Sequence, residues 1–197
     1  MFDSVHASKP KMMLRRMHKL LDEADAVITY FGDSFDLPTL SKEFVLHGFT
    51  PPAPFKKVDL CRVVQRTFKF PSNKLDYVGQ ALGLGMKTRH TGFEMWVQCM
   101  AGDAKAWKLM EKYNRRDVTL LEQLYDRLKP WIKSHPNHRL YDDDALCPNC
   151  GSVRHQRRGY AMSKVLKYSR FQCLECGTWF RSTHCVKDAT TRYTQVQ

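Results

Sequence analysis

The stretch that decides the fold of the N-terminal part is EKYNRRDVTLLEQLYDRL, residues 111–128. Its leucines recur at three- and four-residue spacing, which predicts an amphipathic helix. The same helical stripe carries Tyr113 and Asp117, four residues apart. A carboxylate in line with core-facing leucines is costly unless it is paired, hydrogen-bonded or bound to a metal. We therefore expect a metal or a cation opposite Asp117; an ion pair with Arg115 or Arg116 would also satisfy it.

Length, composition and charge limit the classes of protein to which the chain can belong. The chain has 197 residues, of which 43% are hydrophobic, enough for one ordinary domain and a small annex. No run approaches the ~20 apolar residues of a membrane span, and no secretory signal is visible, so a cytoplasmic protein is expected. The net charge of +12 predicts a polyanionic partner, nucleic acid first, although some proteins are basic without one.

The positive charge is concentrated at the C-terminal end. From Ala145 onward, nine lysines and arginines stand against two acidic residues, more than half of the net charge in about a quarter of the chain. The segment before it, SHPNHRLYDDDA, reads as a polar linker. We therefore expect a first domain over residues 1–133, a linker over 134–144, and a separate basic module with its tail over 145–197.

Two CxxC pairs, each followed by glycine, define the C-terminal module. Two such turns predict a tetrahedral zinc site that holds the small domain together, with no open position for catalysis. Disulfides or a redox motif are the alternatives, but reduced surroundings and duplication of the motif favour zinc. The segment KYSRFQC predicts the returning strand of a hairpin between the pairs. The expected ligands are Cys147, Cys150, Cys173 and Cys176.

Between the two CxxC pairs, basic and aromatic residues alternate. Cations neutralise phosphates and aromatic rings stack on unpaired bases, so this strip predicts a nucleic-acid contact. A solvated basic face with structural aromatics is the plainer interpretation. The candidate residues are Arg154, Arg157, Arg158, Tyr160, Lys164, Lys167 and Arg170.

Residue periodicity predicts a mostly helical first domain. The short run AVITYF, residues 26–31, is rich in β-branched and aromatic residues and predicts a buried strand. Residues 58–60 predict a short strand or a helix entry. Helices are expected over residues 11–23, 38–46, 61–68, 74–82, 93–100 and 104–128.

Asp36 stands just after the predicted strand, where the chain enters a helix. A carboxylate at a strand end and another on a helix packed across it can share a divalent metal. Two-metal phosphoryl chemistry needs about four such acids around two ions. Tyr113 could orient an attacking water whose pKa the metals lower.

The segment YFGDSFDLPTL, residues 30–40, followed by Tyr113-x-x-x-Asp117, resembles the second and third motifs of the DnaQ-like DEDDy 3′–5′ exonucleases. The similarity, over about residues 20–179, extends to phage and prokaryotic members with a C-terminal zinc ribbon. It implies an α/β fold: a partial RNase H-like domain, mostly helical in this chain, plus a small β-rich zinc ribbon. It also implies that Asp36 and Asp117 bind Mg²⁺ or Mn²⁺, with Tyr113 positioning water.

The chain departs from the family pattern at two points. Phe31 stands where the family commonly has Asn, and no Asp-x-Glu first motif is present. The resemblance thus implies a split enzyme whose other polypeptide supplies that motif and the missing strands, a fragment, or a degenerate subunit. Asp59 and Lys74 fall in similar regions without a catalytic role; Asp59 can cap a helix, and surface pairing explains Lys74.

These observations predict a metal-dependent 3′–5′ exonuclease acting on nucleic acid, DNA first. Its first catalytic motif is expected from another polypeptide. The alternative is a non-catalytic zinc-ribbon subunit, derived from an exonuclease, that binds nucleic acid or serves in assembly. A zinc-stabilised interaction module that binds no nucleic acid is the third interpretation.

Overall fold

The computed structural model describes residues 10–86, 92–141, 144 and 146–188. The chain forms two compact units, Met1–Leu128 and Lys129–Gln197. Parts of the expected first domain, linker and tail fall outside the described residues.

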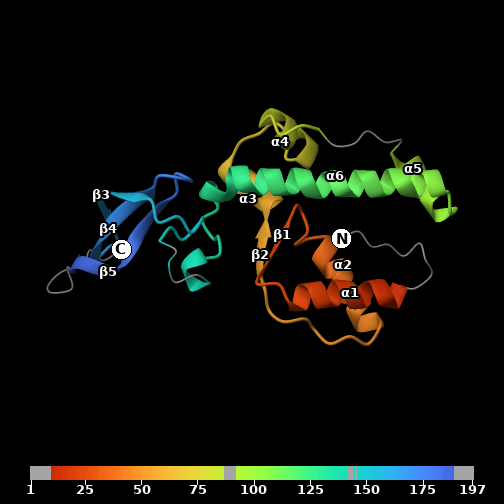
Figure 1. Ribbon diagram of the computed structural model, residues 1–197, viewed down its shortest axis with the longest axis horizontal. Helices are drawn as coiled ribbons and strands as arrows, with labels where there is room; N and C mark the ends of the chain where they lie inside the picture. Colours follow the sequence, from red (N-terminus) through yellow and green to blue (C-terminus); the bar gives the residue numbers. More distant parts are fainter. Residues whose placement is uncertain (1–9, 87–91, 142–143, 145, 189–197) are drawn as a thin grey trace. The chain divides into compact units, whose positions relative to one another are not determined.

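The first unit is mostly helical, as the sequence predicts (Figure 1). Each expected helix is present, with ends that lie within two residues of the expected ones. Residues 56–59 form a strand that leads directly into a helix. The elements are α1 Pro10–Asp22, β1 Ala26–Thr29, α2 Asp36–Leu46, β2 Lys56–Asp59, α3 Leu60–Thr67, α4 Leu75–Ala81, α5 Phe93–Met100 and α6 Ala104–Leu128.

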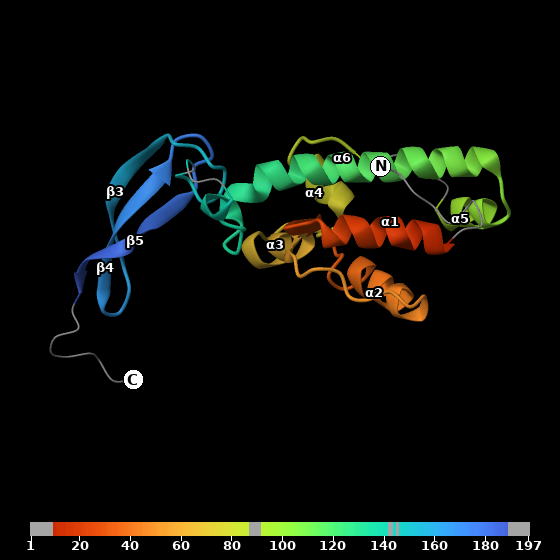
Figure 2. The ribbon, with the colours of Figure 1, turned by 60° about the horizontal axis from the view of Figure 1, so that its bottom comes forward.

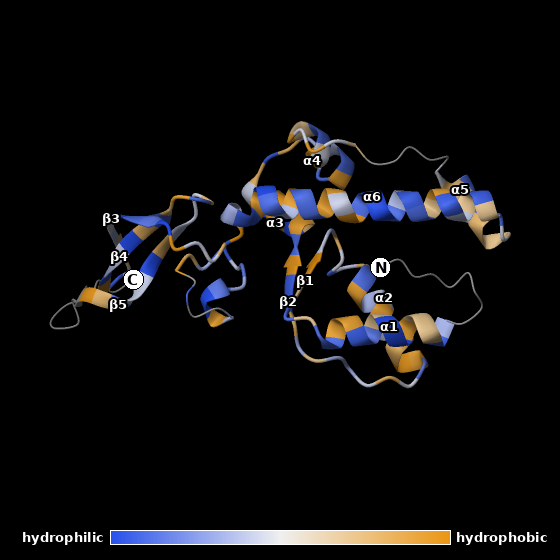
Figure 3. Cartoon of the chain, in the orientation of Figure 1, coloured by the Kyte–Doolittle hydropathy of each residue, from blue (hydrophilic) through white to orange (hydrophobic). Residues whose placement is uncertain are grey.

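Strands β1 and β2 form a parallel pair, with Ala26 opposite Lys56 and Thr29 opposite Asp59. The crossover through α2 is what a parallel connection requires. In the part of the chain that the structure describes, β1 pairs with no strand other than β2. Figure 3 shows β1 as largely hydrophobic and β2 as mixed. The sheet is thus a two-stranded fragment with one hydrophobic strand at an open edge.

Helices α1 and α2 pack on each other through a core of Leu14, Leu21, Leu37 and Phe44. In Figure 1 these two helices lie on one side of the strand pair and α6 lies on the other. The imidazole of His18 contacts the ring of Phe44 at a centroid distance of 5.2 Å and extends this core.

Helix α6 confirms the amphipathic helix predicted from residues 111–128. Leu120, Leu124 and Leu128 are buried on one face. Gly79 of α4 approaches this face closely, since a Cβ there would lie 3.0 Å from a Leu120 methyl carbon. At its other end, Met110 packs with α5 through Met95 and other residues. Among the described residues, no helix combines the length and apolar content needed to cross a membrane.

The second unit is a three-stranded antiparallel sheet in the order β3–β4–β5, preceded by two short 3-10 helices (Figure 2). The hairpin predicted between the CxxC pairs is present, and the predicted returning strand is β4. The third strand was not predicted. The elements are η2 Lys129–Trp131, η3 His138–Leu140, β3 His155–Met162, β4 Leu166–Cys173 and β5 Trp179–Asp188.

Candidate active site and metal centre

The carboxylate of Asp59 fixes the turn that follows β1. Asp59 is only 5% exposed, and its oxygens accept backbone N–H hydrogen bonds from Phe31 at 2.8 Å and Asp33 at 3.2 Å. It also accepts the Cys61 N–H at 3.0 Å, so the predicted helix-cap role is confirmed. One buried acid therefore joins the end of β2, the start of α3 and the loop that leads to Asp36.

Phe31 adopts a left-handed backbone conformation, with φ of 66°, and its side chain is 53% exposed. This region is unfavourable for most L-residues and is best tolerated by Gly, Asn and Asp. The position at which the resemblance expects Asn therefore has the backbone that suits Asn. The N–H bond to Asp59 holds Phe31 in this conformation.

Asp36 begins α2, which puts its carboxylate in the first turn of the helix. Burial raises the pKa of Asp36, and the charge of Asp59 raises it further, while a hydrogen bond from its own backbone opposes them. Pro38 lies in the same turn, where its missing N–H leaves no helical hydrogen bond unmade. In the protein alone, the ionised form of Asp36 is therefore disfavoured. A cation bound beside it would favour the ionised form and lower its pKa.

Asp36 and Asp117 line the same cleft, which has a volume of about 850 Å³. Residues of α1, β1, α2, α3, α4 and α6 form its walls, and apolar side chains such as Leu21, Ile28 and Leu121 make up much of them. One carboxylate oxygen of Asp117 is buried. The structure thus brings together the two acids that the sequence singled out.

Tyr113 lies outside this lining. It is half-buried against the cluster of Met95, Cys99, Ala106 and Met110, one helical turn before Asp117. The predicted phenol is therefore not among the residues that line the cleft with the two predicted acids.

Two other polar residues of α4 and its entry line the cleft, Lys74 and Asp76. The Asp76 carboxylate accepts a hydrogen bond from the Gln80 side chain at 2.7 Å. The sequence reasoning missed Asp76, whose only signal was an acid in the first turn of a predicted helix. Three carboxylates from this chain therefore reach the cleft, but no three His, Cys, Asp or Glu ligand atoms among the described residues cluster there.

A profile of the RNase H superfamily matches residues 2–129, which contain every element of the first unit and the cleft. The chain belongs to the RNase H superfamily. A comparison with curated proteins finds no match. Superfamily membership suggests a hydrolase of nucleic acids. Nucleases of this superfamily use divalent metals, and carboxylates such as the two in the cleft are groups that can bind such metals.

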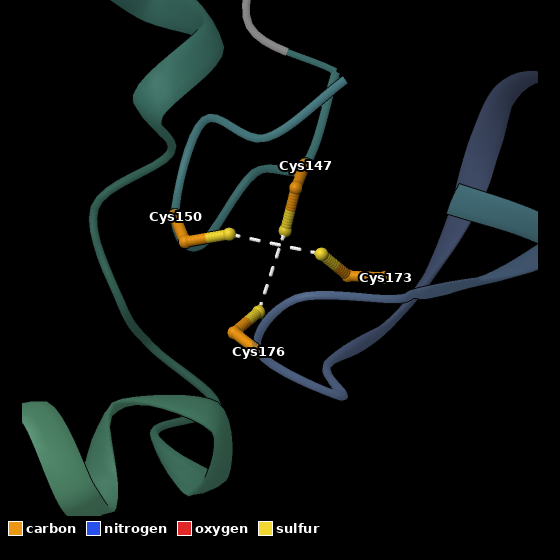
Figure 4. A group of neighbouring side chains, drawn as sticks. All are labelled: Cys147, Cys150, Cys173 and Cys176. Atoms are coloured by element: carbon orange, nitrogen blue, oxygen red, sulfur yellow. Dashed lines mark hydrogen bonds between the residues drawn. The ribbon is translucent and has the colours of Figure 1, made fainter. Parts of the chain in front are cut away.

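The second unit of this RNase H superfamily protein, outside the matched residues, carries a four-cysteine centre (Figure 4). The sulfurs of Cys147 and Cys176 are 3.7 Å apart, as are those of Cys150 and Cys173. Four sulfurs about 2.3 Å from one tetrahedral zinc ion would be about 3.8 Å apart. All four thiols point to a common centre in Figure 4, and the spacing is too long for disulfides, so the group can hold one metal ion.

Both turns of the centre have the same backbone design. Gly151 and Gly177, the glycines that follow the two CxxC pairs, have φ of 77° and 74°, a left-handed conformation that glycine adopts without a steric penalty. Each glycine N–H donates to the carbonyl of the first cysteine of its pair, at 3.0 Å to Cys147 and 3.2 Å to Cys173. The two knuckles are therefore structurally equivalent.

Asn149 joins the two knuckles of the superfamily member's ribbon. Its side-chain amide donates to Thr178 Oγ1 at 2.9 Å and to Cys176 Sγ at 3.6 Å. Burial opposes ionisation of Cys176, but the hydrogen bonds from Thr178 and Asn149 lower its pKa to about 6. A thiol that ionises near neutral pH is suited to metal binding.

The basic residues of the ribbon lie against aromatic rings. Lys167 Nζ is 3.9 Å from the centre of the Tyr160 ring, and the Arg157 guanidinium is 5.0 Å from it. Arg170 lies 5.1 Å from the ring of Trp179. The remaining members of the predicted strip are exposed: Arg154, which pairs with Glu175, together with Arg158 and Lys164.

The sequence reasoning missed the contribution of β5 to this surface. Arg181 lies 3.6 Å from the ring of Tyr168, and Trp179 is 51% exposed. The sequence carries a Trp-Phe-Arg run at residues 179–181, shortly after the second CxxC pair. Because no strand was predicted there, these side chains could not be assigned to a face of the sheet.

Proposed function

We propose that this RNase H superfamily protein is a metal-dependent 3′–5′ exonuclease of the DEDDy type that acts on nucleic acid, DNA first. The observation that supports this most is the convergence of Asp36 and Asp117 on one cleft. In the proposal both carboxylates hold Mg²⁺ or Mn²⁺. Bound divalent ions would supply a water of lowered pKa and neutralise charge on the phosphate.

Tyr113 keeps its proposed role as the phenol that positions the attacking water. Because its ring packs beside Met95 and Met110, this role requires the ring to turn toward the cleft when substrate binds. Replacing Tyr113 with Phe should then lower the rate of nucleotide release while leaving Mn²⁺ binding unchanged.

The proposal includes a second polypeptide. Two-metal chemistry needs about four acidic ligands, and the predicted pair supplies two. A strand bearing Asp-x-Glu could pair with the free edge of β1, which in the described residues is paired with β2 and with no other strand. All four residues of β1 are half-buried, and the adjoining cleft is largely apolar, which supports an added strand there.

The C-terminal unit is proposed to be a zinc ribbon that holds the nucleic acid strand. Its exposed cations, ring-stacked on Tyr160, Tyr168 and Trp179, support phosphate and base contacts. The proposal places the protein in the cytoplasm, where cysteines stay reduced and can bind zinc as thiolates. If phosphates are bound, retention on DNA should fall steeply with salt.

A nuclease assay tests the proposal directly. The chain is mixed with the product of the reading frame immediately upstream and incubated with Mn²⁺ and a 3′-labelled single strand. We expect release of labelled nucleotides, and loss of that release with Asp36→Ala or Asp117→Ala. No release from the mixture would rule out the exonuclease.

The same variants separate the second candidate, a non-catalytic nucleic-acid-binding or assembly subunit. It is favoured by the absence of a three-ligand acidic cluster among the described residues. It predicts that Asp36→Ala and Asp117→Ala leave strand binding and biological activity intact, while Cys147→Ser abolishes both.

A further inference from the structure

A small pocket lies beside the four-cysteine centre, wholly within the second unit. Its volume is about 270 Å³. Residues 130–135 form one wall, and the first knuckle and the start of β5 form the other. A hydrogen bond of 2.8 Å from the His138 N–H to the Pro148 carbonyl attaches the segment after that wall to the knuckle. The zinc-binding turn therefore builds one side of the pocket.

Two tryptophans line this pocket, and both are widely exposed. Trp131 is 59% exposed and Trp179 is 51% exposed. Large aromatic side chains normally bury most of their surface, and exposed ones beside a cavity are typical of platforms for flat ligands. Cations stand close by, since Lys133 lines the pocket and the Arg170 guanidinium lies 5.1 Å from the Trp179 ring. The pocket thus suits an aromatic ligand attached to negative charge.

Asn149 supplies a polar group to this pocket. It is 4% exposed, and its amide nitrogen is used by Thr178 and Cys176. Its Oδ1 atom is buried and has no hydrogen-bond partner among the described residues. Leaving a buried acceptor unsatisfied is costly, and most such groups in native proteins find a donor. An N–H group of a ligand would satisfy it, which requires Oδ1 to become accessible when the pocket is occupied.

We propose that this pocket holds one unpaired nucleobase of a single-stranded nucleic acid. Trp131 and Trp179 provide the stacking surfaces, and Asn149 Oδ1 accepts one N–H of the base. Lys133 and Arg170 contact the adjoining phosphates. The inference rests on the proposed binding of nucleic acid and makes it specific, because a base inside a duplex cannot enter. Every natural base offers an N–H, so the pocket discriminates single strands from duplexes rather than one sequence from another.

The test compares two probes of equal charge. Fluorescence anisotropy measures the affinity of the zinc-loaded full chain for a short deoxythymidine strand and for the same strand built from abasic residues. Mg²⁺ and Mn²⁺ are omitted so that no cleavage occurs. We expect the base-bearing strand to bind at least about fivefold more tightly. Trp179→Ala and Trp131→Ala should each bring that ratio toward one, while Trp179→Phe should keep most of it.

Trp96→Ala is the matched control, because Trp96 is also 51% exposed but lies on α5 in the first unit. It should leave the ratio unchanged. Zinc content should show that the second-unit variants are folded, and the helical circular dichroism signal should show the same for Trp96→Ala. Equal binding of both probes by the unaltered protein would overturn the base pocket while leaving phosphate binding intact. Binding of neither probe would overturn both. Failure of the exonuclease alone would appear as absent nucleotide release with the ratio preserved.

Discussion

Asp59 accepts the backbone N–H of Phe31 at 2.8 Å, which ties the end of β2 to the turn that follows β1. The same carboxylate accepts two further N–H groups, those of Asp33 and Cys61. The bonds to Phe31 and Asp33 fix the loop between β1 and α2, which carries Asp36 into the cleft, while the bond to Cys61 caps α3. A structural acid thus sets the position of a candidate functional one.

Replacing Asp59 with Ala should therefore destabilise the first unit strongly. One buried and two part-buried N–H groups would lose their acceptor, and we expect a loss of about 3 kcal/mol in the free energy of unfolding. Urea denaturation followed by circular dichroism measures it. Asp126→Ala, at an exposed acid of α6, is the control and should change stability by no more than about 0.5 kcal/mol. Equal effects of the two changes would contradict this role of Asp59.

Phe31→Asn should stabilise the protein. The left-handed conformation costs most residues about 1–2 kcal/mol, and Asn relieves much of this while giving up a half-exposed ring. We expect a gain of about 1 kcal/mol, visible as a higher melting temperature. Phe31→Leu, which keeps the unfavourable backbone, should give no gain. A destabilised Phe31→Asn variant would show that the ring makes contacts worth more than the strain.

The raised pKa of Asp36 gives a pH-dependent prediction. The carboxylate of Asp36 ionises less readily in the folded state than in the unfolded state. The free energy of unfolding therefore falls as pH rises from the ordinary pKa of 3.8 through the raised pKa of the folded state. Asp36→Asn removes this penalty, so it should melt higher than the unaltered protein at neutral pH and equally well below pH 3.8. A difference in melting temperature that is the same at every pH would contradict the assignment.

Removal of the metal from the cysteine centre should unfold the second unit alone. The unit has about 70 residues by its bounds and a thin sheet, so a metal held by the four cysteines would supply much of its stability. Chelation or Cys147→Ser should abolish the binding of one zinc per chain. It should also abolish the change in Trp179 fluorescence that accompanies zinc binding, while the helical signal of the first unit persists. Cys185→Ser, at an exposed cysteine of β5 outside the cluster, should bind zinc normally.

Local patterns predicted much of the fold. The leucine spacing of residues 111–128 predicts α6, and the β-branched run after residue 25 predicts β1, because both signals lie within one element. The four cysteines were found from spacing alone, since each CxxC-Gly turn is a local structure with one dominant use. A shared metal for Asp36 and Asp117 was suggested by their places at a strand end and on a helix, but only the family resemblance favoured it over an ion pair, because the two acids lie on different elements.

The features that the sequence did not predict depend on contacts between distant segments. Nothing near Asp59 in the chain indicates that it would bind the N–H groups of Phe31 and Asp33. Strand β5, WFRSTHCVKD, mixes aromatic, polar and charged residues without a regular alternation, so its sequence does not distinguish a ribbon edge from a loop. The tryptophan pocket joins residues 130–135 to β5, and only the folded unit brings Trp131 and Trp179 to one cavity.

The most direct measurement of the central claim is Mn²⁺ binding, followed by electron paramagnetic resonance of the free ion. The zinc-loaded chain should bind Mn²⁺ and lose that binding with Asp36→Ala and with Asp117→Ala, while Asp126→Ala should retain it. Equal uptake of Mn²⁺ by the unaltered protein and by both cleft variants would contradict a cation site between Asp36 and Asp117.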